Sequence, residues 1–234
     1  MVRRVISAME VGSPLGRITR LWRYPVKSLR PEALQRATVV NDGLAGDRQR
    51  ALIVSNRQHA RYGKPYRGKE HHLLHTTDNV GEARRWGSAR GVVLETRDGG
   101  PFFDAAPVSI LIDTWLVQAE HITGMPLDPQ RFRPNLFVRA DASFVATEGE
   151  LIGATLEAGS VRLRVRAPIE RCVTITYDVE TGTPMPQVLS ELARKRATTL
   201  GVYCDVLRAG TLGLGDSLNR LPDVAELRPR HDSA

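Results

Sequence analysis

Residues 154–165 read ATLEAGSVRLRV, and this stretch decides the fold class. Two short apolar segments flank the turn Ala158-Gly159-Ser160, which predicts a β-hairpin. In its second segment, valine or leucine at positions 161, 163 and 165 alternates with arginine at 162, 164 and 166. A period of two places one set of side chains in a core and the other in solvent. The stretch therefore predicts an antiparallel sheet with one buried face.

Similar short segments lie on both sides of this hairpin. Strands are expected at 16–24, 37–40, 50–55, 135–140 and within 201–221, and a second hairpin at 91–104 with its turn at Asp98-Gly99-Gly100. Helices are expected at 80–86, inside a polar, basic stretch (56–90), at 113–122 and at 186–200. Because strands and helices do not alternate as βαβ units, the sequence predicts a mostly β, α+β protein of β-barrels decorated by helices.

Residue types at the expected helix ends support those two C-terminal helices. Asp113 suits an N-cap and Gly124 suits a helix end. In the later helix, Pro186 fits the first turn, and Val188, Leu189 and Leu192 face inward.

The composition restricts the class of function. The chain has 234 residues, 41% of them hydrophobic, and a formal net charge of +7, which favours anionic partners. Two cysteines are too few for a disulfide framework, so a reducing, cytoplasmic setting is expected. No apolar run has the length of a membrane helix, and the first residues do not form a secretory signal.

Cys172 lies in residues 168–182, PIERCVTITYDVETG, a stretch that reads as a strand. Cysteine is often a small buried apolar residue, so a core position is one interpretation. Chemistry is the other, because thiolate sulfur suits a soft metal and a cationic neighbour such as Arg171 lowers the pKa of a thiol. Cys204 has no accompanying motif and is expected to be structural.

Several polar residues are candidates for holding an anion. Lys27 and Ser28 follow the first strand, and Arg48 follows Asp47. Arg133 and Asn135 are two apart in an expected strand and so should share one face. Solvated turns and surface ion pairs explain the same residues without a ligand.

Three stretches, in order, carry a family resemblance. They read RYPVKSLRPEAL with GLAGDRQRALIV, then RFRPNLFV, then ERCVTITYDVETG with LSELARKR and GTLGLGDSL. They resemble the MOSC family, the C-terminal domain of molybdenum cofactor sulfurases, and within it the molybdenum-containing amidoxime-reducing branch. The resemblance covers residues 17–55 and 104–218. It implies an N-terminal arm (1–15), a β-barrel-like N-terminal domain (16–103) packed on a β-rich MOSC domain (104–221), and a tail (222–234).

The resemblance also implies a cofactor and a reaction. Molybdenum on a phosphate-bearing pterin would be ligated by Cys172, and the protein would reduce N-hydroxylated or N-oxide-type small molecules. The residues implied to hold the cofactor are Lys27, Ser28, Arg48, Asp113, Thr114, Arg133, Asn135, Arg171 and Cys172. Electrons would come from a separate donor protein. Pyridoxal phosphate belongs to the sulfurases' lyase portion and is not expected in this chain.

Two other functions stay open at this point. The chain could carry the cofactor, or relay sulfur on Cys172 as a persulfide, without turning over a substrate. It could also be a basic β-barrel that binds RNA, although the arginines at 162, 164 and 166 lack interleaved aromatics. The histidines His71, His72 and His75 lack further ligands for zinc and are expected in a polar loop near the site. Asp178 is expected either beside the site or in a turn.

Overall fold

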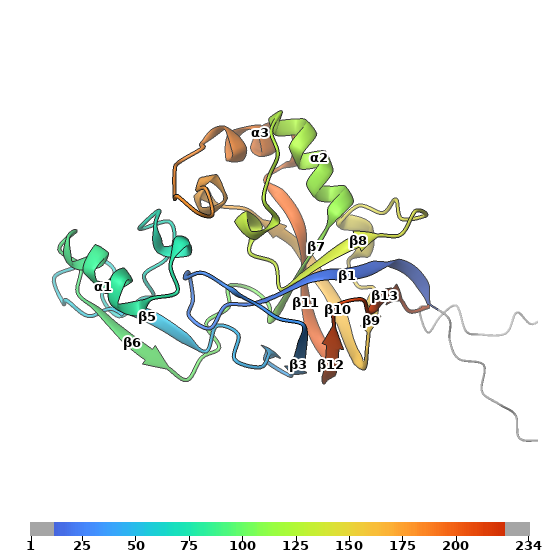
Figure 1. Cartoon of the computed structure of the whole chain (residues 1–234), viewed down its shortest axis with the longest axis horizontal. Helices are drawn as coiled ribbons and strands as arrows, with labels where there is room; N and C mark the ends of the chain where they lie inside the picture. The colour runs from blue at the N-terminus through green and yellow to red at the C-terminus, as the bar shows by residue number, and fades with distance from the viewer. Residues whose placement is uncertain (1–11, 223–234) are drawn as a thin grey trace, which may run out of the picture.

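A closed barrel of seven strands forms the centre of the protein (Figure 1). The computed structural model describes residues 12–222. Its strands are β1 (Ser13–Arg23), β2 (Glu32–Ala33), β3 (Arg36–Val40), β4 (Gly43–Leu44), β5 (Arg50–Val54), β6 (Leu94–Asp98), β7 (Val108–Ile112), β8 (Leu136–Ala140), β9 (Thr155–Ala158), β10 (Val161–Glu170), β11 (Thr199–Arg208), β12 (Gly210–Gly213) and β13 (Ser217–Arg220). Its α-helices are α1 (Val80–Ser88), α2 (Asp113–Thr123) and α3 (Gln187–Arg196), and its 3-10 turns are η1 (Leu74–Thr76), η2 (Pro129–Phe132), η3 (Gly149–Leu151) and η4 (Val173–Thr176). The predicted mostly β, α+β class is confirmed.

The barrel strands follow the order β13-β9-β10-β11-β7-β8-β1, and β1 closes the ring by pairing with β13. Closure matters because an open sheet leaves unpaired N–H and C=O groups along both edges. β1 comes from the part of the chain in which we expected an N-terminal barrel-like domain, yet it lies in the same sheet as strands from residues 108–220. The domain boundaries themselves stay a prediction.

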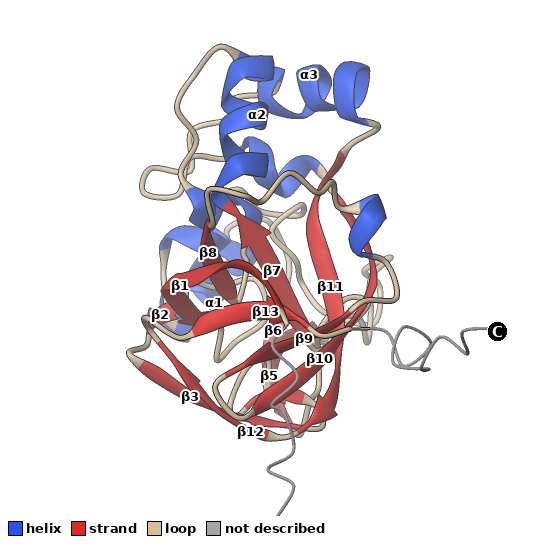
Figure 2. Ribbon diagram, turned by 90° about the vertical axis from the view of Figure 1, so that its right-hand side faces the viewer, coloured by secondary structure: helices blue, strands red, loops and turns tan. Residues whose placement is uncertain are grey.

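The hairpin β9–β10 is confirmed, and so is its alternation. Val161, Leu163 and Val165 are at most 1% exposed, whereas the arginines between them face outward. The inward residues join one large core inside the barrel, which also contains Trp115 and Leu192 from the helices. Figure 2 shows α2 and α3 side by side over one end of the barrel.

A second, smaller core lies beside the barrel. β5 and β6 pair along their full length and α1 packs on them, so that Leu52, Val54, Tyr66 and Leu74 are buried together. This group, called here the side lobe, comprises residues 50–98 and contains the whole polar stretch 56–90. Figure 1 shows it standing apart from the barrel, and the candidate site lies between the two.

Three local expectations were wrong. Residues 91–104 form no hairpin, because Pro101 has no N–H for a ladder and the segment instead bonds to an earlier turn, with Phe102 N donating to the carbonyl of Arg48 at 2.9 Å. The last helix ends at Arg196 rather than near residue 200, because Ala197 and Thr198 take left-handed backbone conformations. The chain also contains one βαβ unit, since β7 and β8 are parallel and joined through α2.

The ends of the elements differ in smaller ways. β1 begins at Ser13, so the last residues of the expected arm belong to a strand, while residues 1–11 and the tail from 223 lie outside the described residues. The N-cap of α2 is Ile112 rather than Asp113, and Gly124 ends that helix in the left-handed conformation as expected. Among residues 12–222, every helix is too short or too polar to cross a bilayer.

Candidate functional site

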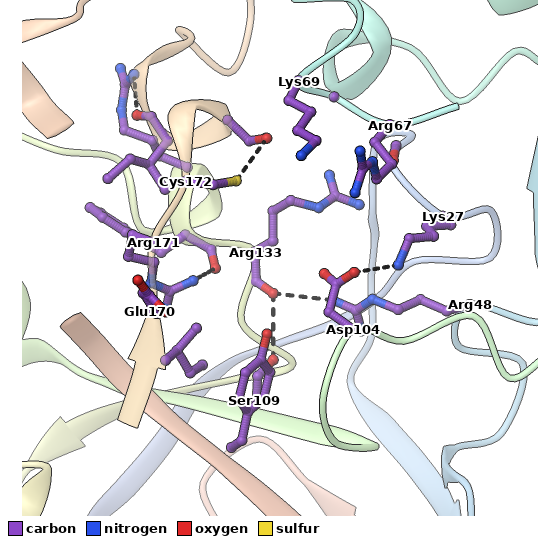
Figure 3. Close-up of a pocket in the computed structure, with 18 residues that line it drawn as sticks. Lys27, Arg48, Arg67, Lys69, Asp104, Ser109, Arg133, Glu170, Arg171 and Cys172 are labelled. Carbon is purple, nitrogen blue, oxygen red and sulfur yellow. Dashed lines mark hydrogen bonds and ion pairs between the residues drawn. The ribbon is translucent and has the colours of Figure 1, made fainter. Parts of the chain in front are cut away.

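A cavity of about 310 Å³ opens between the barrel and the side lobe (Figure 3). It brings together six of the nine residues that the sequence predicted to hold a cofactor. They are Lys27, Ser28, Arg48, Arg133, Arg171 and Cys172. The barrel supplies one wall through the end of β10 and the turns η2 and η4, and the side lobe supplies the facing rim through Arg67, Gly68 and Lys69.

Cys172 lies at the mouth of this cavity. The expectation that it sits on a strand was wrong: β10 ends at Glu170, and Cys172 is the N-cap of the turn η4. Its side chain is exposed, and its sulfur lies 3.4 Å from the hydroxyl of Thr174. Cys204, in contrast, is 0% exposed, and burial raises the pKa of its thiol. The two cysteines therefore differ as expected, one structural and one available to a ligand.

Arg48 and Arg133 both lie against one aromatic ring, that of Tyr24. Their guanidinium carbons lie 4.6 Å and 4.2 Å from the ring centre of Tyr24, which is itself 0% exposed. Tyr24 is fixed at both ends, because its N–H donates to Asp47 at 2.7 Å and its hydroxyl donates to the carbonyl of Pro134 at 3.1 Å. Arg48 also pairs with Asp47. Two arginines are thus pre-positioned at the cavity before any ligand binds.

The backbone at the cavity is unusual as well. Ser28, Arg48 and Arg133 have φ angles of 73°, 48° and 51°, in the left-handed region that side chains other than glycine rarely adopt. Outside the cavity only Ala197 and Thr198 share this property among the non-glycine residues described. Such conformations concentrate at ligand sites, where the surrounding structure enforces them.

Cations outnumber acids around the cavity. Seven of the lining side chains are lysine or arginine, against two acids, Asp104 and Glu170. Lys27 donates to Asp104 at 2.5 Å and to the carbonyl of Phe102 at 2.7 Å. Burial lowers the pKa of Arg133 to about 10 and lowers that of Lys27. Desolvation therefore disfavours these charges, and a bound anion would relieve that cost.

Arg171 is committed to the backbone around the thiol. Its guanidinium donates to the carbonyl of Phe132 at 2.8 Å and to the carbonyl of Leu200. Burial lowers its pKa to about 10. These bonds hold η2 and the start of β11 against the residue that precedes Cys172, so Arg171 positions the thiol as well as contributing positive charge.

The other three predicted residues do not line the cavity. Asn135 does not share a strand face with Arg133, because Arg133 caps η2 and Asn135 is 0% exposed. Its side-chain oxygen accepts from Ser109 N at 3.1 Å, so it ties β7 to β8. Asp113 and Thr114 lie at the start of α2, where Asp113 accepts from Ala140 N at 2.9 Å. A contact of these three with a pterin stays a prediction without support from their placement.

The sequence reasoning missed several lining residues, which are Arg67, Lys69, Asp104, Ser109, Arg131 and Tyr203. Arg131 is 5% exposed, donates to the carbonyls of Ile175 and Tyr177, and lies 3.6 Å from Asp178. Asp178 also caps its own turn by accepting from Thr181 N at 2.9 Å, which is the turn role expected of it, while a role beside a cofactor stays a prediction. The basic character of residues 56–90 was the available signal for Arg67 and Lys69.

The histidines at positions 71, 72 and 75 pack against aromatic rings. His71 stacks on His72 and Trp86, and His75 stacks on Tyr177. Within residues 12–222, no cluster of histidine, cysteine or acidic side chains could hold a metal ion by itself. His75 donates from Nε2 to the carbonyl of Asp178 at 2.8 Å, which leaves a buried Nδ1 that has no partner in the described structure. A second proton on this ring would have no acceptor.

This geometry predicts a loss of stability in acid. Burial, with smaller effects from Arg133 and Arg131, lowers the pKa of His75 to about 4, although its bond to Asp178 opposes the shift. At pH values between the pKa of His75 in the unfolded chain, near 6.5, and its pKa in the folded protein, the ring is protonated in the unfolded chain but not in the folded protein. The free energy of unfolding therefore falls as pH falls through this range. From pH 7.5 to pH 5, His75 should cost about 1–2 kcal/mol of the free energy of unfolding.

Urea unfolding of the wild type and of His75→Gln at both pH values measures this effect. The variant should lose less stability between pH 7.5 and pH 5 than the wild type does. His121→Gln serves as control, because His121 is exposed at the end of α2. Equal losses in the wild type and His75→Gln would show that His75 accepts its proton without cost.

The outward arginines of β10 are mostly paired. Arg162 donates to Glu157 at 2.7 Å, and Arg166 pairs with Asp205. Arg164 donates to the carbonyl of Gly153 at 2.7 Å. These pairs compensate much of the charge that the RNA-binding interpretation requires on this face.

Comparison with known proteins agrees with the architecture. The closed barrel, the cation-lined cavity and the exposed cysteine describe a β-barrel protein with a basic cavity beside an exposed thiol. The MOSC domain matches residues 101–219, and the MOSC N-terminal beta barrel domain matches residues 15–61. The chain therefore belongs to the MOSC family, as its motifs indicated.

Individual relatives are more distant. Molybdenum cofactor sulfurase of Drosophila melanogaster is 29% identical over 108 residues, which are 45% of this chain and 12% of that protein. The structure of the YUAD protein from Bacillus subtilis covers 89% of this chain and 97% of its own, with a TM-score of 0.54 and 16% identity, and so shares the fold. YiiM from Escherichia coli covers 92% of this chain and 71% of its own, with a TM-score of 0.45 and 12% identity.

Proposed function

We propose that this protein binds a molybdenum cofactor and uses it to reduce N-hydroxylated or N-oxide-type small molecules. The observation that carries the proposal is the exposed thiol of Cys172 at the mouth of a cavity lined by seven cationic side chains. Neither feature alone is specific, but together they match a cofactor that combines a thiolate-binding metal with a phosphate. Membership in the MOSC family, and similarity to a molybdenum cofactor sulfurase, support the same cofactor.

The residues around the cavity fit such a group chemically. A soft metal is suited to thiolate sulfur, which Cys172 can provide. The phosphate is suited to guanidinium groups, and Arg48 and Arg133 are held by Tyr24 with little freedom to lose on binding. Lys27 and Ser28 also line the cavity and can add an ammonium and a hydroxyl. Arg131 has a buried Nε atom that finds no partner among the described residues.

The cofactor would supply the two-electron chemistry, while the chain supplies binding, position and electrostatics. Arg48, Arg133 and Lys27 neutralise the phosphate and fix one end of the cofactor. Cys172 fixes the metal end, and Arg171 holds the adjacent backbone in place through the carbonyls of Phe132 and Leu200. Thr174, 3.4 Å from the sulfur, can donate a hydrogen bond to the thiolate and so tune it.

This proposal has consequences for partners and location. The reaction consumes two electrons per substrate, so a separate electron-donor protein would have to deliver them to the cavity. Such a donor, the reducing environment that a free thiol requires, and the cofactor itself are all consistent with a cytoplasmic enzyme. The substrate would be a small molecule, since the cavity of about 310 Å³ must also accommodate part of the cofactor.

The carrier function is the second candidate, and the exposure of Cys172 favours it independently, because an exposed thiol can accept and pass on sulfur.

Elemental and pterin analysis of protein purified from a host that makes the cofactor tests both functions. We expect about one molybdenum and one pterin per chain. Turnover of an N-hydroxylated substrate with an artificial electron donor then distinguishes a reductase from a carrier. Protein without metal or pterin that binds RNA in a salt-sensitive manner would contradict both.

A further inference from the structure

The side lobe adds to the cavity one short element that lies outside both family matches. The two family matches cover residues 15–61 and 101–219. Only three of the lining residues fall outside them, and these are consecutive: Arg67, Gly68 and Lys69. A cofactor common to a family is expected to be held by the stretches that define the family. The segment 67–69, called here the rim turn, is therefore a candidate for a role peculiar to this chain.

The rim turn is held rigidly against the thiol's own turn. A Cβ added to Gly68 would lie 2.9 Å from Cγ2 of Thr174, so a larger residue here would force the Thr174 side chain to shift. Glu70 locks the turn by accepting from Arg67 N at 2.7 Å and from the Arg67 guanidinium at 2.8 Å, and it also lies 3.3 Å from Arg61. The position of the rim turn over the cavity is thus a built feature of the fold.

Within this turn, Lys69 differs from its neighbours. The charge of Arg67 is compensated by Glu70, and the charge of Lys27 by Asp104. Lys69 is exposed, and none of its possible carboxylate partners in residues 12–222 reaches it. In Figure 3 its side chain points into the cavity, toward the guanidinium groups of Arg67 and Arg133. Three cationic groups converging on one space form a site for an anion.

We propose that Lys69 binds an anionic group, such as a carboxylate, carried by the substrate. This inference rests on the proposed reductase function and names the substrate class. The charge of Lys69 points the same way, because amidine products are cations at neutral pH and an uncompensated ammonium group in the cavity would repel them. A carboxylate on the same molecule cancels that charge and occupies the space beside Lys69. The substrates that this enzyme prefers are therefore N-hydroxylated molecules that also carry a negative charge.

A matched pair of probes tests the proposal. N-hydroxybenzamidine is compared with its 3-carboxylate and 4-carboxylate derivatives, using the cofactor-loaded protein and an artificial electron donor. We expect the wild type to prefer the better carboxylate by about tenfold in kcat/KM, and Lys69→Met to lose that preference. Lys69→Arg should restore most of it. Lys64→Met is the control, because Lys64 is exposed in the same segment and does not line the cavity.

A second measurement does not depend on turnover. Calorimetry of benzamidine and its 3- and 4-carboxylates gives the same comparison as binding constants, and pterin content is measured on every variant. Equal preference in the wild type, or a preference that persists in Lys69→Met, would overturn the proposal. Loss of pterin from Lys69→Met would show that Lys69 holds the cofactor's phosphate instead. If no probe is reduced while carboxylates still bind through Lys69, the reductase function fails and the anion site stands.

Discussion

Cys172→Ser protein should fold as the wild type does, but its reductase activity should fall by more than roughly 100-fold. That loss exceeds the effect of removing a residue that only supports a metal ligand. Serine conserves the shape of the side chain, but it offers a harder oxygen that stays protonated and binds a soft metal poorly. Stability should change by no more than about 0.5 kcal/mol, because the side chain is exposed. Thermal melting, molybdenum content and turnover of N-hydroxybenzamidine measure the three effects. Pterin should remain, because in the proposed arrangement its phosphate is held by Arg48, Arg133 and Lys27 rather than by Cys172.

Cys204→Ala provides the opposite pattern and serves as control. Cys204 is 0% exposed in the barrel core, so removing its sulfur leaves a small cavity and should cost about 1 kcal/mol of stability. Molybdenum content and turnover should stay at wild-type levels. Full molybdenum and full turnover in Cys172→Ser would remove the thiolate from the mechanism. Activity lost equally in both variants would point to misfolding.

Arg133→Met should lower the affinity for the pterin phosphate by about 10- to 100-fold, which is the effect of losing one charged hydrogen bond of about 1.5–3 kcal/mol. Methionine keeps a long apolar side chain and removes only the guanidinium, which lies over the Tyr24 ring. The cofactor-free protein should melt within a few degrees of wild type, because the lost bond from Arg133 to the carbonyl of Leu29 is offset by removing a costly buried charge. Pterin content after gel filtration measures the loss.

Arg139→Met is the matched control for this variant. Arg139 lies six residues later on β8, is exposed, and does not line the cavity. Its substitution removes the same unit of charge from the protein and should leave pterin content unchanged. If both variants retain pterin equally, the phosphate is held elsewhere in the cavity. If both lose it equally, net charge rather than the Tyr24-supported arginine pair controls binding.

The sequence predicted elements better than their pairing. The strands β1, β3, β5 and β8, the hairpin β9–β10 and the helices α1 and α2 could be read from periodicity, because local side-chain pattern determines which face of an element is buried. The partners of β6 and of β1 could not. β6 pairs with β5 across the whole polar stretch 56–90, and that choice depends on a small core in which Tyr66 and Leu74 are buried with Leu52. The hydrophobic pattern of a short segment does not predict such a long-range contact.

The candidate site shows the same limit. Cys172, Lys27, Arg48 and Arg133 were found through motifs and charge, and the structure brings them to one cavity. Asn135 was misread as facing a ligand, because its spacing from Arg133 suggested one strand, whereas Arg133 adopts a left-handed turn before the strand begins. Lys69 was missed, because its place at the cavity depends on how the side lobe folds back over the barrel.

The pairing of β1 with β13 also orders events during synthesis. β1 is among the first segments of the described chain to leave the ribosome, and Ser217–Arg220 is the last of its strands. Until that final strand emerges, β1 and β9 both present open edges, which are the part of a sheet most prone to join other chains. We therefore expect a chain that ends before residue 217 to aggregate rather than to form a smaller closed barrel.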